Sequence, residues 1–334
     1  MDGVTDWAFR DLLTRLARRD ASPPSPSSGS NGGSRMSIES VDGFSTAHNA
    51  IDWCVSEFVR ITQRPAPAKL LKRACPELEN AGRTRSGVAV HLQLLGGNPD
   101  PIAETARLAV DLGASGIDLN FGCPAKTVNR HDGGASLLRH PRRLEGIVCA
   151  VRAAVDPEIP VSAKIRTGWD NHRSVRTLAR AAENGGASWL TVHGRTRSEG
   201  YGPAANWEAV GDARDAVDIP VVANGDLNSA SALERCRNRS GCDAFMLGRG
   251  AMARPQIFGE IRGWIAAGQH LPLSEILLQH AELLIANDAS SSLVVRRTKQ
   301  WLCLAAKIDT GLGPLFESIK RLGEVDVCLR TLSA

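Results

Sequence analysis

Short apolar runs alternate along this chain with amphipathic stretches rich in alanine, leucine and arginine, and this alternation most constrains the fold. The runs are almost continuously apolar, which is typical of parallel strands that helices cover from outside. The pattern therefore predicts an α/β protein with a parallel sheet. Seven strands are expected, at Ile51–Glu57, Val88–Leu95, Gly116–Asn120, Pro160–Ile165, Trp189–His193, Pro220–Ala223 and Asp243–Leu247.

The later runs each end in polar or glycine-rich residues. A TIM (β/α)₈ barrel keeps its active site at the carboxyl ends of its strands, so this placement favours a barrel. The alternative, a doubly wound sheet, usually shows a glycine-rich fingerprint after its first strand, and this sequence shows none there. The ends in question are Asn120–Cys123, Lys164–Arg166, His193–Arg195, Asn224–Asp226 and Gly248–Gly250.

Two further stretches divide the chain. Residues 20–45 are rich in proline, serine and glycine and poor in large apolar residues, so we expect a flexible insert there. From about Leu273 the pattern is helical to the end. The chain opens with a loop and a helix at Trp7–Arg18, so the expected barrel, residues 1–260, lacks its first strand. Residues 272–334 are expected to form a helical domain.

Composition narrows the class of protein only slightly. A net charge of +4 permits a polyanionic partner without requiring one. No apolar stretch is long enough to span a bilayer and no secretory leader is evident, so we expect a cytoplasmic protein with reduced thiols and no membrane contact. The eight cysteines form no C-x-x-C pair and no histidines have zinc spacing, so no metal is expected.

Cys123 is the strongest candidate for chemistry. Gly122 and Pro124 flank it and force an irregular turn directly after the strand that ends at Asn120. Most free cysteines are buried packing residues, and that interpretation is preferred for the other seven. A thiol held at a barrel mouth is mostly protonated at neutral pH and can act as a general acid.

The wording around Cys123 resembles the tRNA-dihydrouridine synthase family, most closely its bacterial C-type branch, which acts on uridine 16 of the D-loop. The likeness covers nearly the whole chain except the proline/serine/glycine insert. The motifs that carry it are LNFGCPAKTVN at 119–129, MDGVTD at 1–6, SEFVR at 56–60, QLLG at 93–96, KIRTGWD at 164–170, VHGRT at 192–196, ANGD at 223–226, GRGA at 248–251 and RTKQWL at 297–302.

The resemblance implies FMN across the barrel mouth and NADPH as reductant. Its phosphate would lie in the loops after strands seven and eight, where Gly248-Arg249 alone could also be a solvated turn. Lys164 would face the anionic edge of reduced flavin and Gln93 its pyrimidine edge, while His193 lies beside the ring or is simply structural. The implied cofactor residues are Met1, Asp2, Gly3, Gln93, Lys164, His193, Asn224, Gly225, Asp226, Gly248 and Arg249.

The resemblance also implies tRNA as partner and substrate of a monomer. Asn120 and Arg166 match positions that hold the target base and nearby backbone. The target base must leave its stack to be reduced. A second set would orient the tRNA, although a basic run at Arg296–Gln300 is often only a solvated helix face. That set is Glu57, Arg297, Lys299 and Lys320.

Two rival functions remain open. The family normally has a strand ending in Ala-Pro before the Met1-Asp2-Gly3 loop, and this sequence does not contain it. The chain could therefore be a truncated tRNA-binding protein without activity. It could also be another FMN-dependent barrel reductase that acts on a small molecule, although such enzymes do not share the turn around Cys123 together with a basic helical tail.

Overall fold

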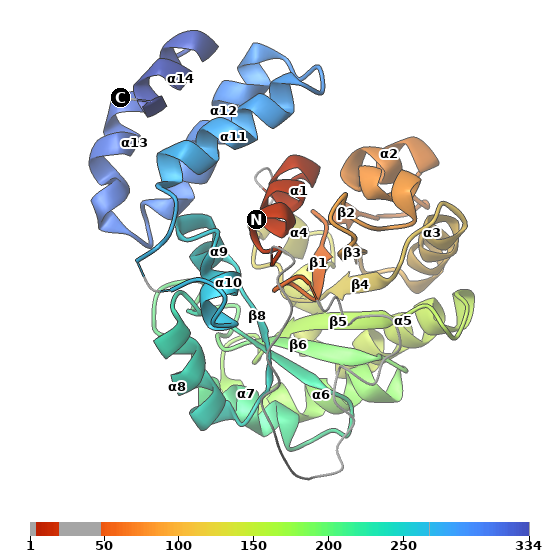
Figure 1. The fold of residues 1–334 in the computed structure, drawn as a ribbon. Coiled ribbons are helices and arrows are strands. Elements are labelled where there is room, and N and C mark those ends of the chain that lie inside the picture. The colour runs from red at the N-terminus through yellow and green to blue at the C-terminus, as the bar shows by residue number, and fades with distance from the viewer. Residues whose placement is uncertain (1–4, 20–47, 267, 334) are drawn as a thin grey trace.

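A computed structural model describes residues 5–19, 48–266 and 268–333. Its centre is one curled parallel sheet (Figure 1). All seven expected strands are present, and the short β2 (Val59–Arg60) continues the line of β1 along β3. In spatial order the strands are β1 (Trp53–Val55), β3 (Ala89–Leu95), β4 (Ile117–Asn120), β5 (Val161–Arg166), β6 (Trp189–His193), β7 (Val221–Asn224) and β8 (Ala244–Met246).

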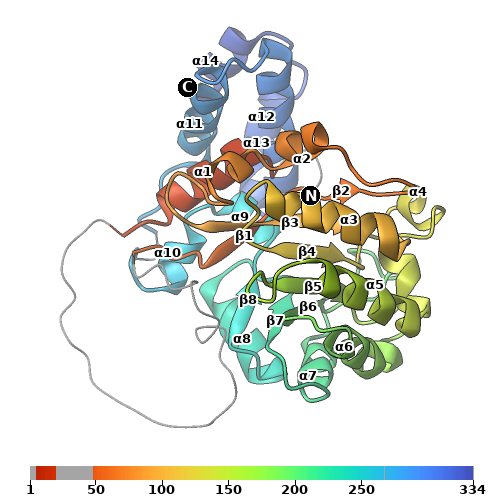
Figure 2. The same cartoon turned by 90° about the vertical axis from the view of Figure 1, so that its right-hand side faces the viewer.

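Helices cover the outer face of this sheet (Figure 2). Alternate strand residues such as Val90, Leu92 and Leu94 point outward into the main core, against helix residues such as Ile102 and Leu178. The outer helices are α2 (Ala68–Ala74), α3 (Pro99–Asp111), α5 (Pro141–Ala154), α6 (Val175–Asn184), α7 (Trp207–Arg214) and α8 (Ala230–Ser240). The parallel sheet with outer helices confirms the fold class.

Local sequence explains where these helices begin and end. Proline occupies the first turn of α3 and α5, where its missing N–H costs no hydrogen bond. The Ser229 side chain caps α8 by accepting from the Ala232 amide. The same helix ends at Gly241, whose φ of +65° is left-handed and suits glycine. The outer helices lie in the crossover connections between strands, which lets successive strands return to the sheet in parallel.

The sheet is open between β8 and β1. Among the described residues, β1 and β8 are the two ends of the strand order, and no pairing joins them. The inner face is filled at its base by Ala89, Trp189 and Val222, against which Trp53 packs. The molecule is therefore a half-barrel whose strands all deliver their carboxyl ends to one rim, as the expected barrel without its first strand requires.

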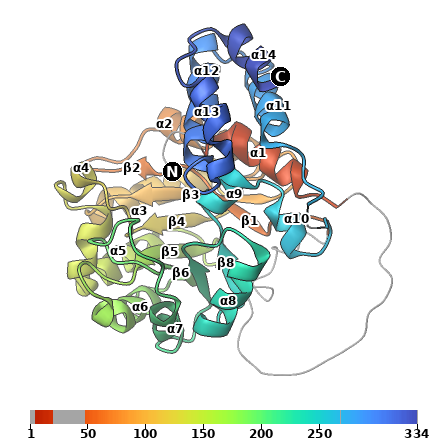
Figure 3. The ribbon, with the colours of Figure 1, turned by 90° about the vertical axis from the view of Figure 1, so that its left-hand side faces the viewer.

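The remaining helices gather beside α1 (Trp7–Leu16) and α9 (Arg249–Ala253) (Figure 3). Trp301 anchors them: its ring lies 4.7 Å from that of Phe9, and its Nε1 donates to the Met252 carbonyl at 2.8 Å. The expected helical end of the chain is confirmed, and its independence as a domain stays a prediction. These helices are α11 (Leu273–Ile285), α12 (Ser291–Ala305), α13 (Gly313–Ile319) and α14 (Val325–Ser333).

Shorter helices complete the fold. They are α4 (Lys126–Asn129), α10 (Ile257–Ile261) and the 3-10 turns η2 (Pro76–Asn80), η3 (Gly134–Arg139), η4 (His172–Ser174) and η5 (Thr310–Leu312). The expected insert at 20–45 and the expected cofactor residues Met1, Asp2 and Gly3 lie outside the described residues.

Candidate active site

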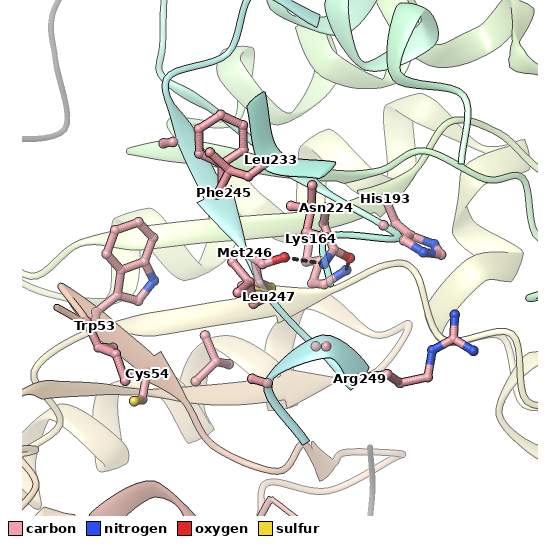
Figure 4. A pocket seen from close by; sticks show the side chains of 18 of the residues that line it. Trp53, Cys54, Lys164, His193, Asn224, Leu233, Phe245, Met246, Leu247 and Arg249 are labelled. Carbon is pink, nitrogen blue, oxygen red and sulfur yellow. Dashed lines mark hydrogen bonds between the residues drawn. The ribbon is translucent and has the colours of Figure 1, made fainter. Parts of the chain in front are cut away.

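A cavity of about 1480 Å³ opens at the carboxyl ends of the strands and extends toward the open side of the sheet (Figure 4). Among the residues expected from the sequence, it brings together positions as much as 156 apart, from Gln93 to Arg249. Eleven residues expected from the sequence line it: Gln93, Asn120, Cys123, Lys164, Arg166, His193, Asn224, Gly225, Asp226, Gly248 and Arg249.

A chain of hydrogen bonds runs under the rim of this cavity. The buried carboxylate of Asp118 accepts from Gln93 Nε2 at 2.6 Å and from Ser162 Oγ at 2.7 Å. Gln93 Oε1 in turn accepts from Asn120 Nδ2 at 2.8 Å. Asn120 Oδ1 accepts from the backbone amides of Gly122 and Cys123, both at 3.0 Å. The strand ends and the turn that carries Cys123 are therefore one connected unit.

The half-buried Cys123 is held on the cavity wall by its neighbours. Its carbonyl accepts from the Ala135 amide at 3.1 Å, which closes the loop between β4 and η3. The adjacent Gly122 carbonyl accepts from Arg166 Nε at 2.9 Å. Hydrogen bonds before and after the residue thus hold the backbone that carries the thiol.

Arg166 lies where expected, but its guanidinium is occupied by the protein. Besides Gly122, its Nη1 donates to the carbonyls of Thr196 and Gly200, both at 2.9 Å. The side chain is buried and joins the turn after β4 to the loop after β6. In this structure the hydrogen bonds of Arg166 hold these two loops together.

Lys164 extends from β5 toward Asn224 at the end of β7 (Figure 4). Its Nζ donates to Asn224 Oδ1 at 3.0 Å, and Asn224 Nδ2 donates to the Met246 carbonyl at 2.7 Å. Burial, together with the charge of Arg166, lowers the pKa of Lys164 to about 8. A lysine ammonium has three donors, and within the described residues only one is used, so this group can also bind an anion.

A second cationic corner lies in the loops after β6, β7 and β8. Asp226 accepts from Arg195 Nη2 at 2.6 Å, and its other oxygen lies 3.8 Å from Arg249 Nη2. Gly225 has a φ of +118°, and Asp226 follows at +56°. The Asp226 carboxylate therefore lies between the two arginines. Among the described residues, the buried Nη1 of Arg195 has no hydrogen-bond partner.

Two rings lie beside these cations. Burial, followed by the charges of Lys164 and Arg166, lowers the pKa of His193 well below its usual value, so this ring is neutral. Tyr201 is 56% exposed, and its ring lies 4.7 Å from the Arg249 guanidinium and 5.2 Å from that of Arg166. Arginines on an aromatic face are attracted to it electrostatically.

Sequence reasoning missed Tyr201, Arg195, Asp118 and Ser162. A usable signal existed for Tyr201: it is the chain's one tyrosine and stands in a glycine-rich loop just after the strand ending at His193. Aromatic residues in loops at a catalytic rim often contact ligands. No sequence signal distinguished Asp118 from an ordinary buried strand residue.

The four residues expected to orient tRNA lie outside the cavity. Arg297 is 16% exposed, with Nε 3.0 Å from Asp6 Oδ2 and Nη2 4.0 Å from Glu57 Oε2. Lys299 donates to the Leu322 carbonyl, and Lys320 pairs with Glu317. Arg297 and Glu57 therefore meet at the junction between the sheet and the helical region, while the two lysines are on the helical region itself.

The described residues contain no group of three or more histidine, cysteine, aspartate or glutamate side chains placed to hold a metal ion. No helix in the described part of the chain is long and apolar enough to cross a membrane.

The fold is of the barrel type, and its candidate site has a cationic rim. A family model described as Dihydrouridine synthase (Dus) matches residues 1–324. The tRNA-dihydrouridine(16) synthase of Aquipseudomonas alcaligenes is 39% identical over 325 residues, covering 96% of this chain and 93% of the relative. That of Escherichia coli (strain K12) is 40% identical over 337 residues, covering 100% and 96%. The chain belongs to the dihydrouridine synthase family.

A solved structure supports the architecture alone. Histamine dehydrogenase from Rhizobium sp. 4-9 superimposes with a TM-score of 0.50 and 14% identity, over 70% of this chain and 44% of that one. Family membership makes the protein a flavin-dependent oxidoreductase acting on tRNA. The site fits a flavin because Lys164 offers unused donors on one side and Arg195 and Arg249 form a cationic corner on the other.

Proposed function

We propose that this protein reduces the C5–C6 double bond of uridine 16 in the tRNA D-loop, with FMN as cofactor and NADPH as the source of electrons. The observation that carries the proposal is the placement of Cys123. Asn120 holds the turn with Cys123 on one wall of a cavity whose other walls carry Lys164 and Arg249. A proton donor and an anion-binding rim thus share one cavity.

The reaction adds a hydride and a proton across one carbon–carbon double bond. When bound, the reduced flavin supplies the hydride to C6 of the uracil ring. Cys123 donates its thiol proton to C5, so negative charge does not accumulate on the ring. The neutral His193 and the Lys164 ammonium line the same cavity on the neighbouring strands β6 and β5, where Lys164 would stabilise an anionic flavin edge.

The FMN phosphate is assigned to the loops after β7 and β8. Arg249 carries the charge, and Gly225 and Gly248 allow backbone amides to approach. Asp226 holds Arg249 and Arg195 in place instead of contacting the phosphate itself. Gln93, near the carboxyl end of β3, and Asn224, the last residue of β7, are amide groups that suit hydrogen bonding to a heterocyclic ring.

The uracil base is assigned to the space between Asn120 and Tyr201. A base flipped out of its loop is usually read by hydrogen bonds to its edge and by stacking on an aromatic ring. Asn120 has an amide group at the rim, and Tyr201 has an exposed ring next to Arg166. Met1, Asp2 and Gly3 remain assigned to the cofactor by family resemblance.

The helical region is proposed to hold the tRNA body. Lys299 and Lys320 supply positive charge there, and Arg297 with Glu57 sets the angle at which this region meets the sheet. The same proposal places the protein in the cytoplasm, as a monomer.

The experiment is an assay of dihydrouridine on a tRNA transcript with uridine 16, beside the same transcript carrying cytidine 16. We expect product only from the first, with NADPH and with FMN released on denaturation. A flavin-loaded protein that modifies neither tRNA but reduces small enones would favour the small-molecule reductase. A colourless protein that binds tRNA would favour the inactive tRNA-binding protein.

A further inference from the structure

Asp118 is a buried carboxylate that the proposed reaction does not use. It lies on the inner face of β4 and is 1% exposed. Burial raises the pKa of this carboxyl, while hydrogen bonds from Ser162 and Gln93 and the charge of Lys164 oppose the rise. Burying such a group is costly, and an apolar residue would serve packing alone as well or better. A function other than packing is therefore expected.

The carboxylate determines which way two neighbouring amides face. An ionised carboxylate only accepts hydrogen bonds, so Gln93 must direct its NH₂ group toward Asp118. The Gln93 carbonyl then faces Asn120 and requires the Asn120 NH₂ group as donor. The Asn120 carbonyl is thereby left to face the amides of Gly122 and Cys123, which need an acceptor.

We propose that Asp118 is a positioning residue that sets the polarity of this amide chain and so holds the turn that carries Cys123. The inference rests on the proposed function for its catalytic meaning. If both side-chain amides turned over, the Asn120 NH₂ group would face two backbone N–H donors, and both hydrogen bonds to the turn would be lost. Gln93 and Asn120 would also present the opposite groups to a flavin and a base.

Ser162 makes a discriminating test available. In Asp118→Asn the Ser162 hydroxyl can donate to the Ile117 carbonyl, 3.5 Å from its Oγ, and accept from the new NH₂ group, so the new carbonyl still accepts from Gln93. The orientation of the Gln93 and Asn120 amides is therefore retained. In Ser162→Ala the carboxylate remains, so this orientation is again retained. Only the double variant loses both constraints, because the amide introduced at position 118 no longer has a hydroxyl that fixes its orientation.

The first measurement is the rate at which iodoacetamide alkylates Cys123 in the flavin-loaded protein, followed by peptide mass spectrometry. The exposed Cys149 is the internal reference. We expect each single variant to stay near the parent rate. The alkylation rate of Cys123 in the double variant should differ from the parent rate by about tenfold, which corresponds to the loss of about one hydrogen bond to the turn.

The second measurement is single-turnover formation of dihydrouridine, with flavin content and melting temperature as checks on folding. We expect the loss of rate in the double variant to be about tenfold greater than the product of the losses in the two single variants. The affinity for tRNA should be unchanged. The proposal would be overturned if, in both measurements, the effect of the double variant equalled the product of the effects of the two single variants. An inactive parent protein would defeat the proposed function, whereas the alkylation cycle would still decide the role of Asp118.

Discussion

Arg297 on α12 lies with its Nε 3.0 Å from the Oδ2 atom of Asp6, the N-cap residue just before α1. Asp6 also caps α1 by accepting from the Phe9 amide at 3.0 Å. The buried His280 lies 3.7 Å from the same carboxylate and packs edge-on against Trp301. Burial would raise the pKa of Asp6, but these partners outweigh it and lower the pKa. One carboxylate therefore joins the helical region to the first helix.

Replacing Arg297 by alanine is expected to lower the free energy of unfolding by about 1–3 kcal/mol, because it leaves the Asp6 carboxylate without its closest charged partner. Arg296→Ala is the matched control, since Arg296 is the exposed neighbour on the same helix, and surface changes usually stay within about 0.5 kcal/mol. Urea titration of both variants checks this. Equal stabilities would show that the Arg297–Asp6 pair contributes nothing.

Replacing Lys299 by alanine is expected to weaken tRNA binding and to leave flavin content unchanged. If Lys299 contacts one phosphate, the slope of log K against log salt should fall by about one. Arg180→Ala, on the outer helix α6, is the control for general charge loss. Filter binding at several salt concentrations measures the slopes. A slope that stays at the parent value would make Lys299 only a brace for the Leu322 carbonyl.

Acid should weaken the fold through His91. Burial lowers the pKa of His91 to about 3, below its usual value of 6.5, so below pH 6.5 the unfolded chain takes up a proton that the folded chain does not. Stability is therefore fully present above pH 6.5 and falls as the pH drops toward 3. Between pH 7 and pH 5 the loss from this residue is about 2 kcal/mol.

His91→Gln removes this titration and should lose about 2 kcal/mol less than the parent between pH 7 and pH 5, whatever its stability at pH 7. His131→Gln, at an exposed position, should follow the parent. Chemical denaturation at each pH measures all three proteins. Parallel losses in the parent and the His91 variant would mean that His91 is not the group that titrates.

Local pattern was sufficient for the strands and for most of the cavity. Near-continuous apolar runs marked the parallel strands, and parallel strands end at one rim, which places residues such as Arg166 and Asn224 there. The burial of Arg297 was not predictable, because the same basic run on a helix could equally face solvent. The roles of Asp118 and Tyr201 depend on contacts between loops and strands far apart in sequence, which periodicity does not contain.

Cys123→Ala is expected to keep its flavin, its reduction by NADPH and its affinity for tRNA, and to form dihydrouridine slowly. The thiol is proposed to supply only the proton to C5, and general acid catalysis typically contributes about 10²–10⁴-fold. The side chain is small and half-buried, and the turn is held by the backbone amides of Gly122 and Cys123, which alanine retains. Single-turnover assays on unmodified tRNA measure the rate of the reduction itself.

Cys149→Ala separates this chemistry from the general loss of a thiol. Cys149 is exposed on α5, so the expectation that it is a buried packing residue is wrong. It lies outside the cavity, and its variant should match the parent in both rate and stability. Cys123→Ser tests the acid further, because a hydroxyl keeps the size of the thiol but releases its proton far less readily, so the rate should stay low. Cys123→Ala and Cys123→Ser both remove the thiol at position 123, whereas Cys149→Ala keeps it. The proton-donor role therefore predicts that the first two variants are slow and that the third is not. Parent-like rates from Cys123→Ala would remove Cys123 as the acid and leave the cavity without its proposed proton donor.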